Sequence, residues 1–321
     1  MESRKLISFG SSSYVVSLPK NWVDSNKLGK GDSIYIEEKP NELLITIDSA
    51  EKEKEIREKQ IDASGKSVKR IESEIVAAYL NTYDILEIRG IKDSDIPKIK
   101  EIIQNLAGLE ILEQTANKIV ARDLINVNEV SIKTLIRRVD IIVRSMIDDA
   151  LSCLGCWECS DNNCVAQLDS RDSDVNRLTR LISRMAVAAL KDPKLAKKFN
   201  TNPIEVMTES DLANRLERIG DHIKRLVRHV KSAQQDAKQF KEICRIFEVL
   251  KDKYLMIMKA YYAKDVQAAF EVETTAKELF RECDNLFENG PNKHTLSIIT
   301  HLKNFMFSIK YAARAIILNS P

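Results

Sequence analysis

The sequence predicts a mainly α-helical protein with a small β-rich region at its N-terminus. The chain holds 9 glycines and 7 prolines, which is 16 of 321 residues or about 5%, against roughly 12% in average proteins. No proline lies between Ala121 and Asp192 or between Ile204 and Gly290, and both intervals carry apolar residues at helical spacing. This scarcity of turn-forming residues argues against an all-β sandwich.

The first 50 residues follow a different pattern. Short β-prone runs at 13–18, 33–36 and 43–47 alternate with turn-forming segments at 10–12, 28–32 and 39–42. Trp22 and Val23, followed by Lys27 and Leu28, predict one short helix between the first two runs. We therefore expect a small β domain over residues 1–50.

Two further segments precede the long helices. Residues 51–65 open with a run of mixed charges and are predicted to be a solvated linker or an exposed helix. Residues 66–124 are predicted to form a small α/β unit, with one helix whose apolar face holds Ile71, Ile75, Ala78 and Tyr79, a second helix over 96–106, and strands at 84–88, 109–112 and 119–124. No catalytic constellation lies in this unit, and the sequence does not indicate its role.

Residues 131–321 carry apolar positions in alternating steps of three and four, the spacing of helical bundles. A weak internal repeat has a constant offset of 90 residues. It aligns Leu212, Leu216, Ile219, Ile223 and Leu226 with Leu302, Met306, Ile309, Ala313 and Ile316. We expect two three-helix bundles, over residues 131–232 and 236–321.

Charge and motif content exclude several classes of protein. The net charge of 50 − 48 = +2 does not indicate a surface coated in positive charge, so nucleic-acid binding would need a local basic patch. No apolar run reaches the 18 residues of a spanning helix, so we expect a cytoplasmic protein without stable membrane insertion. No Ser/His/Asp arrangement or glycine-rich phosphate-binding motif occurs, so an enzyme is not expected.

One pair of carboxylates could bind a cation. Glu217 and Asp221 are four residues apart, so both point from one face of a predicted helix, and Gly220 beside them has no side chain. Carboxylates at this spacing can coordinate a divalent metal. The alternative is ion pairing with nearby arginines at 215, 218 and 225.

The segment Glu-Arg-Ile-Gly-Asp-His at 217–222 resembles the PhoU family of phosphate-signalling proteins, and the resemblance covers residues 131–321. It implies tandem three-helix bundles, regulation of phosphate uptake and docking on a phosphate transporter or sensor kinase. It also implies a divalent metal or iron held by paired carboxylates. The second-helix element of that family corresponds to Asp172 and Asn176, with an amide where a second carboxylate is usual.

The second repeat departs from this pattern. Glu217 and Asp221 align with Phe307 and Tyr311, and Asp172 and Asn176 align with Glu273 and Lys277. An ammonium group repels a cation. At most one metal site is therefore expected, in the first bundle.

Residues 1–48 resemble the AbrB-type swapped-hairpin DNA-binding domain, through the segments at 10–20 and 28–32, Trp22 and the run at 43–47. The resemblance implies an interleaved homodimer, because so short a chain buries too little surface alone. The candidate DNA-binding residues are Arg4, Lys5, Lys20, Lys27 and Lys30. The alternative is a domain that dimerises without touching DNA.

A cluster of four cysteines lies where the first long helix is expected to turn into the second. Cys153, Cys156, Cys159 and Cys164 have the spacing C-x2-C-x2-C-x4-C, which could close around zinc or an iron–sulfur cluster, or undergo redox chemistry. The alternative is a set of unliganded thiols. Cys244 and Cys283 are expected to be core residues.

Together these patterns predict a homodimeric, DNA-binding regulator of phosphate homeostasis, similar to archaeal regulators that join the two domains. Two other hypotheses stay open. One is a signalling adaptor that docks on a phosphate transporter or sensor kinase without binding DNA. The other is a metal- or redox-responsive regulator that uses the cysteine cluster.

Overall fold

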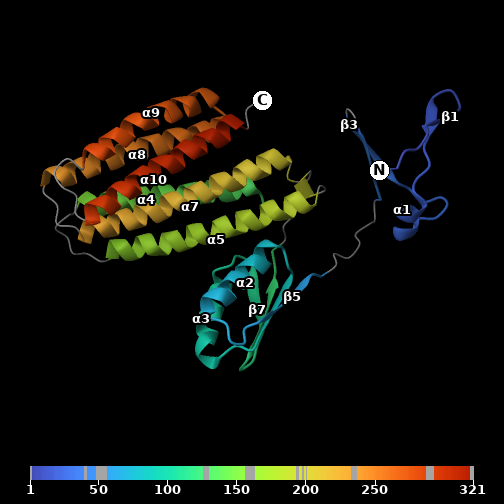
Figure 1. Cartoon of the computed structure of the whole chain (residues 1–321), viewed down its shortest axis with the longest axis horizontal. Coiled ribbons are helices and arrows are strands. Elements are labelled where there is room, and N and C mark those ends of the chain that lie inside the picture. Colours follow the sequence, from blue (N-terminus) through green and yellow to red (C-terminus); the bar gives the residue numbers. More distant parts are fainter. Residues whose placement is uncertain are drawn as a thin grey trace. The chain divides into compact units, whose positions relative to one another are not determined.

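The computed structural model describes residues 2–39, 42–47, 56–125, 130–155, 163–192, 195–196, 199, 201–232, 237–286 and 293–318. The chain forms two compact units, Met1–Glu55 and Ile56–Pro321. Figure 1 shows their helices and strands.

The first unit is built from two hairpins and one helix. Strands β1 (Ile7–Phe9) and β2 (Ser13–Val15) pair antiparallel, and Gly10 at their turn has a φ of +72° that favours glycine. Helix α1 (Lys20–Ser25) leads to the second antiparallel hairpin, β3 (Tyr35–Lys39) and β4 (Glu42–Thr46). The hairpins form separate two-stranded sheets.

No described side chain of this first unit is buried. Phe9 is 71% exposed, Tyr14 73% and Ile36 57%. Apolar side chains on a strand ordinarily face a core. The apolar faces of the two hairpins therefore lack a core within one chain.

The second unit begins with a four-stranded sheet. Its elements are β5 (Glu58–Asp62), α2 (Val68–Leu80), β6 (Ile85–Arg89), α3 (Ile96–Gln104), β7 (Leu109–Gln114) and β8 (Lys118–Asp123), with a 3-10 turn at Asp93–Asp95. The strand order is β5-β6-β8-β7, with β5 parallel to β6 and the other pairs antiparallel. Apolar residues of α2 and α3 pack on one face of this sheet, around the fully buried Tyr79, Leu86 and Ile99.

Strand β5 corrects the later part of the predicted linker over 51–65, whose residues 51–55 lie outside the described part of the chain. Residues 58–62 pair with β6, and Ile61 is 2% exposed within the core of the sheet. An edge strand with one solvent-facing side needs few apolar residues. Because charged residues surround Ile61, the sequence pattern does not indicate a strand here, although residues 58–62 form one.

Six long helices make up the rest of the described chain. They are α4 (Ile132–Gly155), α5 (Asn163–Lys191), α7 (Pro203–Ser232), α8 (Ala237–Ala263), α9 (Val266–Asn285) and α10 (Lys293–Leu318). Both halves of the predicted repeat are buried, from Leu212 to Leu226 and from Leu302 to Ile316. Asp265 caps α9 by accepting a 3.0 Å hydrogen bond from the Ala268 backbone N–H. The predicted fold class is confirmed.

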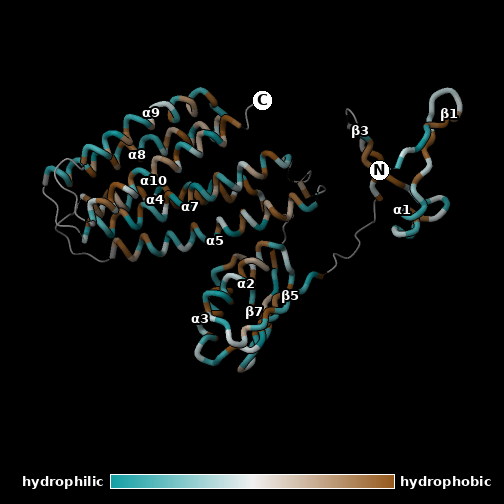
Figure 2. The backbone as a smooth tube through the Cα atoms, in the orientation of Figure 1, coloured by the Kyte–Doolittle hydropathy of each residue, from teal (hydrophilic) through white to brown (hydrophobic). Residues whose placement is uncertain are grey.

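The two bundles share one hydrophobic core. Helices α4, α5 and α7 pack together, α8, α9 and α10 pack together, and α7 lies against α10. Figure 2 shows apolar and polar residues alternating along each helix, as expected for helices with one buried face. None of the described helices is long and apolar enough to cross a membrane.

Candidate functional sites

The predicted carboxylate cluster is assembled, and a lysine lies inside it. The Asn176 side-chain amide donates a 3.2 Å hydrogen bond to Asp172, which is 7% exposed. The Lys224 ammonium contacts the same Asp172 carboxylate and lies 3.4 Å from Asp221 Oδ1. Arg225 pairs with the other Asp221 oxygen at 2.7 Å. Lys224 and Arg225 therefore neutralise part of the negative charge of Asp172 and Asp221.

Glu217 lies beside this cluster on α7. Burial, and then the charges of Asp221 and Asp172, raise the pKa of its carboxyl above the ordinary range. Within the described parts of the chain, no group of three or more His, Cys, Asp or Glu side chains is placed to hold a metal ion. The metal site at these residues stays a prediction.

Gly220 serves helix packing. A Cβ atom there would lie 3.3 Å from Met146 Sδ on α4, so the missing side chain lets α4 approach α7 closely. The group that approaches the helix backbone at Gly220 is therefore a core methionine.

Aromatic packing and an ion pair take the equivalent positions in the second bundle. Phe307 contacts Phe280 with ring centroids 4.5 Å apart, and Tyr311 lies under the Arg215 guanidinium at 4.4 Å. Glu273 pairs with Arg314 at 2.8 Å. The Arg215–Tyr311 contact also joins the two bundles, because the residues lie on α7 and α10.

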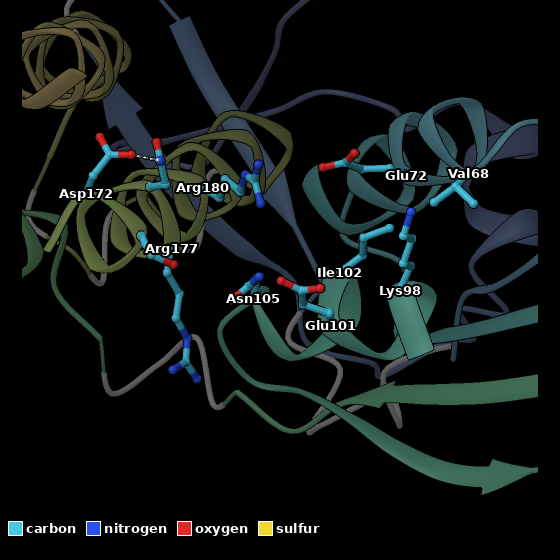
Figure 3. Close-up of a pocket in the computed structure, with 11 residues that line it drawn as sticks. Val68, Glu72, Lys98, Glu101, Ile102, Asn105, Asp172, Arg177 and Arg180 are labelled. Carbon is cyan, nitrogen blue, oxygen red and sulfur yellow. Dashed lines mark hydrogen bonds between the residues drawn. The ribbon is translucent and has the colours of Figure 1, made fainter. Parts of the chain in front are cut away.

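A polar cleft of about 430 Å³ lies between α5 and the helices of the α/β unit (Figure 3). Asp172, Asn176 and Arg180 line it from α5, and Glu72 and Glu101 line it from α2 and α3. The cleft therefore reaches one side of the carboxylate cluster.

Arg184 fixes α5 to the α/β unit. This arginine is 2% exposed, and its guanidinium contacts the Asp123 carboxylate and the Tyr79 carbonyl oxygen. It also stacks over the Tyr79 ring at 4.7 Å. Sequence reasoning missed this contact, and the available signal was an arginine beside the apolar positions Ile182 and Met185.

The four histidines of the chain meet along α7 and α10. His222 Nδ1 and His301 Nδ1 are 3.2 Å apart, within hydrogen-bond reach. His229 stacks on His301 at 5.5 Å between ring centroids, and its ring centroid lies 5.8 Å from that of His294. Burial lowers the pKa of His301 to about 4 and lowers that of His222. The seven-residue spacing on both helices, 222 to 229 and 294 to 301, was the signal that sequence reasoning did not use.

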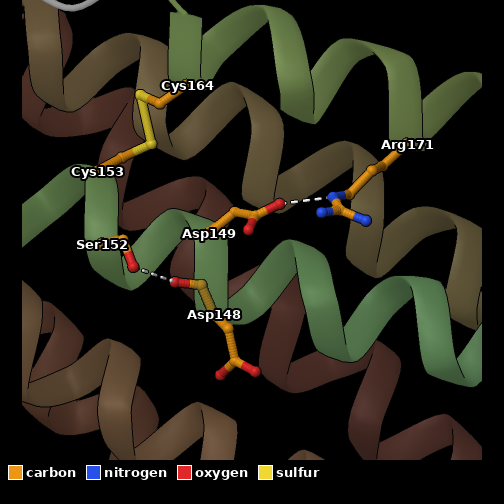
Figure 4. Close-up of a disulfide and its surroundings, with 6 residues drawn as sticks. All are labelled: Asp148, Asp149, Ser152, Cys153, Cys164 and Arg171. Carbon is orange, nitrogen blue, oxygen red and sulfur yellow. Dashed lines mark hydrogen bonds and ion pairs between the residues drawn. A yellow bond between two sulfur atoms is a disulfide. The ribbon is translucent and has the colours of Figure 1, made fainter.

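Two of the four clustered cysteines form a disulfide. Cys153 at the end of α4 is bonded to Cys164 at the start of α5 (Figure 4). In this form neither residue can act as a thiolate ligand. Cys156 and Cys159 lie outside the described residues. Cys283 is a core residue, as predicted, and burial raises the pKa of its thiol to about 12.

The candidate DNA-binding residues differ in their surroundings. Arg4 donates a 2.9 Å hydrogen bond to Ser17 Oγ and pairs with the Glu2 carboxylate, so its guanidinium already has partners within the first unit. The other four are exposed: Lys5, Lys20, Lys27 and Lys30. These four lysines are therefore the better placed to meet a phosphate backbone.

Comparison with known proteins identifies two regions of the chain. Residues 136–230 match the family model of the PhoU domain, and residues 7–58 match that of the antidote-toxin recognition protein MazE, a bacterial antitoxin. Among solved structures, the chain is similar to PhoU from Pseudomonas aeruginosa, with 17% identity and a TM-score of 0.44 over 58% of this chain and 90% of that one. No curated protein matches the chain. The predicted resemblance is confirmed: a MazE/AbrB-like region precedes a PhoU-like region.

Proposed function

We propose that this chain, which joins a MazE-like region to a PhoU domain, is a homodimeric regulator of phosphate uptake that binds DNA through its first 50 residues. The observation that carries the proposal is the first unit, which combines uncovered apolar hairpin faces with four exposed lysines. A second copy would cover the apolar faces and double the number of lysines. Basic side chains on a dimer are what a phosphate backbone requires.

Salt-dependent binding of the full chain to duplex DNA tests the proposal. Replacing Lys5 and Lys20 by glutamine should weaken binding to all sequences and flatten the salt dependence by about one unit for each phosphate that the variant no longer neutralises. Lys59→Gln with Lys69→Gln removes two charges from the second unit and is the matched control. Equal binding by all three proteins at every salt concentration would place the DNA contact outside these two lysines. Absence of binding by the parent chain would exclude DNA binding.

In that outcome the chain is better described as an adaptor. The first unit would then only dimerise, and the PhoU-like helices would dock on a phosphate transporter or a sensor kinase. The uncovered hairpin faces support dimerisation equally in both functions. The DNA measurement therefore separates the two hypotheses, and the oligomeric state does not.

A redox-responsive form of the same regulator is favoured by the disulfide between Cys153 and Cys164. Its reduction would free the end of α4 from the start of α5. DNA affinity should then differ between oxidised and reduced protein, and Cys153→Ser should abolish the difference. Identical affinities in both states would leave the disulfide without a regulatory role.

A further inference from the structure

A cavity of about 510 Å³ lies where the two bundles meet, away from the carboxylate cluster. Its lining comes from helices of both bundles, with Lys133 and Arg137 on α4, Glu209 on α7, Tyr261 on α8 and Ile316 on α10. Lys264, which precedes α9, completes the rim. This volume falls in the range of cavities that bind small molecules.

The most buried polar residue that lines the cavity is a glutamate. Glu209 is 5% exposed, and the Lys133 ammonium lies 3.7 Å from its Oε1 atom, longer than a hydrogen bond. Burial raises the pKa of this carboxyl to about 6. A buried carboxylate with so distant a counter-ion favours a ligand that donates a hydrogen bond to it.

The wall beside Glu209 is aromatic and aliphatic. Tyr261 is half-buried and its ring meets the Tyr262 ring edge-on, with centroids 5.2 Å apart. The Tyr262 hydroxyl donates a 2.9 Å hydrogen bond to Asp140, which fixes that ring, and Ile316 is 6% exposed. Fixed aromatic rings next to an aliphatic side chain suit the faces of a planar ring.

The mouth of the cavity is basic. Lys133, Arg137 and Lys264 are all exposed, and the Arg137 guanidinium lies 5.3 Å from the centroid of the Tyr262 ring. One further carboxylate, Glu205, lines the cavity and accepts a 3.1 Å hydrogen bond from the Thr201 hydroxyl. The cations lie at the surface and the Glu209 carboxyl lies inside, so an anionic group of a ligand would sit at the mouth and a hydrogen-bond donor of the ligand would sit in the interior.

We propose that this cavity binds a nucleoside phosphate, with the base inside and the phosphate at the mouth. An exocyclic amine of the base would donate to Glu209, the planar ring would lie against Tyr261, and Arg137 and Lys264 would contact the phosphate. An amino acid fits less well, because it carries its ammonium and carboxylate on one carbon. The proposal goes beyond DNA binding and does not depend on it.

Such a ligand would join the two bundles. The base contacts α7 and α8, and the phosphate contacts α4 and the segment before α9, so the bound state holds helices of both bundles together. A ligand that binds only the folded state raises the melting temperature as its concentration rises.

Calorimetric titration of the full chain with AMP, adenosine and inorganic phosphate tests the proposal. AMP should bind most tightly and raise the melting temperature, and phosphate alone should bind most weakly. Glu209→Gln should weaken AMP and adenosine by the same factor, about tenfold or more, because both lose the charged acceptor. Lys264→Gln should weaken AMP and leave adenosine unchanged.

Lys259→Gln is the matched control, because this exposed lysine on α8 does not line the cavity. Its AMP affinity should equal that of the parent chain. The proposal is overturned if none of AMP, GMP and CMP, whose bases all carry an exocyclic amine, binds at millimolar concentration. It also fails if both cavity variants bind AMP as the parent does, or if phosphate alone binds as tightly as AMP. The melting curve of each variant without ligand verifies that it is folded.

Discussion

The ammonium group of Lys224 lies between the carboxylates of Asp172 and Asp221 and neutralises part of their charge. Its side chain is 15% exposed and that of Asp172 is 10% exposed, so water screens this pair weakly. The Lys224 ammonium therefore acts as the counter-ion of these carboxylates, and a divalent cation would have to displace that ammonium to bind them.

Replacing Lys224 by methionine tests whether these carboxylates are stabilised by the lysine ammonium or by a divalent metal ion. Lys224→Met should lower the free energy of unfolding by about 3 kcal/mol, because it leaves Asp172 buried beside Glu217 without its ammonium partner. Millimolar manganese should recover part of the loss in the variant and change the parent little. Thermal melts with manganese and with chelator measure both effects. A parent chain that manganese stabilises more than the variant would favour the predicted metal site instead.

His301 makes the stability of the α7–α10 contact depend on pH. Burial lowers its pKa to about 4 in the folded chain, against an ordinary value of 6.5, so the unfolded chain binds more protons between these values. The stabilising contribution is complete above pH 6.5 and is lost as the pH falls toward 4. Because the ring is only half-buried, we expect a loss of about 2 kcal/mol.

Urea denaturation at pH 7.5 and pH 4.5 measures this loss. His301→Gln should lose less stability between the two pH values than the parent chain, because glutamine does not titrate. Asp221 and Arg225 influence the same ring from α7, and His222 and His229 face it. Equal losses in parent and variant would place the acid sensitivity elsewhere.

At the scale of elements, Arg184 is the main polar contact between α5 and the α/β unit. Arg184→Met should lower the free energy of unfolding by about 3 to 5 kcal/mol, because it leaves the Asp123 carboxylate without its positively charged partner and with only the hydrogen bond from the Ile125 backbone N–H. Adding Asp123→Asn should recover part of that cost, since the uncompensated charge is then gone. Hydrogen exchange of residues 56–125 should become faster in the single variant.

Arg180→Met is the control for this prediction. Arg180 lies one helical turn away on α5 and lines the polar cleft, so its replacement removes an equal charge without breaking the buried pair. If both arginine variants unfold at the same urea concentration, the Arg184–Asp123 pair does not contribute to holding the α/β unit on α5.

The six long helices could be predicted because their spacing in steps of three and four is a local property of the sequence. Strand β5 could not, because its single buried residue, Ile61, lies among charges. The Arg184 contact could not either, because its partners Tyr79 and Asp123 lie 105 and 61 residues away. Propensity and periodicity carry no information on which distant side chains meet.

The candidate sites follow the same division. The spacing of Glu217 and Asp221 placed them on one helix face, but it could not reveal that Lys224, one turn further on, reaches across to Asp172 on α5. The cavity that holds Glu209 is lined by residues from 133 to 316, so it exists only once both bundles have packed. A site whose residues come together only through tertiary packing therefore cannot be predicted from the spacing of residues in the sequence.

At the scale of the whole molecule, polar contacts tie the two bundles into one body. Buried Asp140 on α4 accepts hydrogen bonds from Tyr254 at 2.7 Å and Tyr262 at 2.9 Å, both on α8. Burial and the Asp140 charge raise the pKa of both tyrosines above their ordinary range, so both stay protonated as donors. We therefore expect that a ligand or partner that moves the helices of one bundle also moves those of the other.

The first unit, by contrast, has no buried side chain among its described residues, so we expect a second chain to complete its core. Its hairpins present apolar side chains that are mostly exposed, among them Ile7 at 62% and Ile36 at 57%. If interleaved hairpins cover these faces, dimerisation and folding of residues 1–50 are one process. Ile7→Glu with Ile36→Glu should then weaken the dimer of the full chain by more than about a hundredfold, because two charged side chains replace two apolar ones in each chain.

Sedimentation of four proteins decides where the dimer forms. The parent chain should be dimeric, and both the double variant and a chain beginning at Ile56 should be monomeric while keeping their helical circular dichroism. Ile141→Glu is the matched control, because this residue on α4 is also exposed, at 60%, but lies in the second unit. A chain beginning at Ile56 that dimerises as tightly as the parent would place the interface on the sheet or the helices, and the apolar hairpin faces would then need another partner.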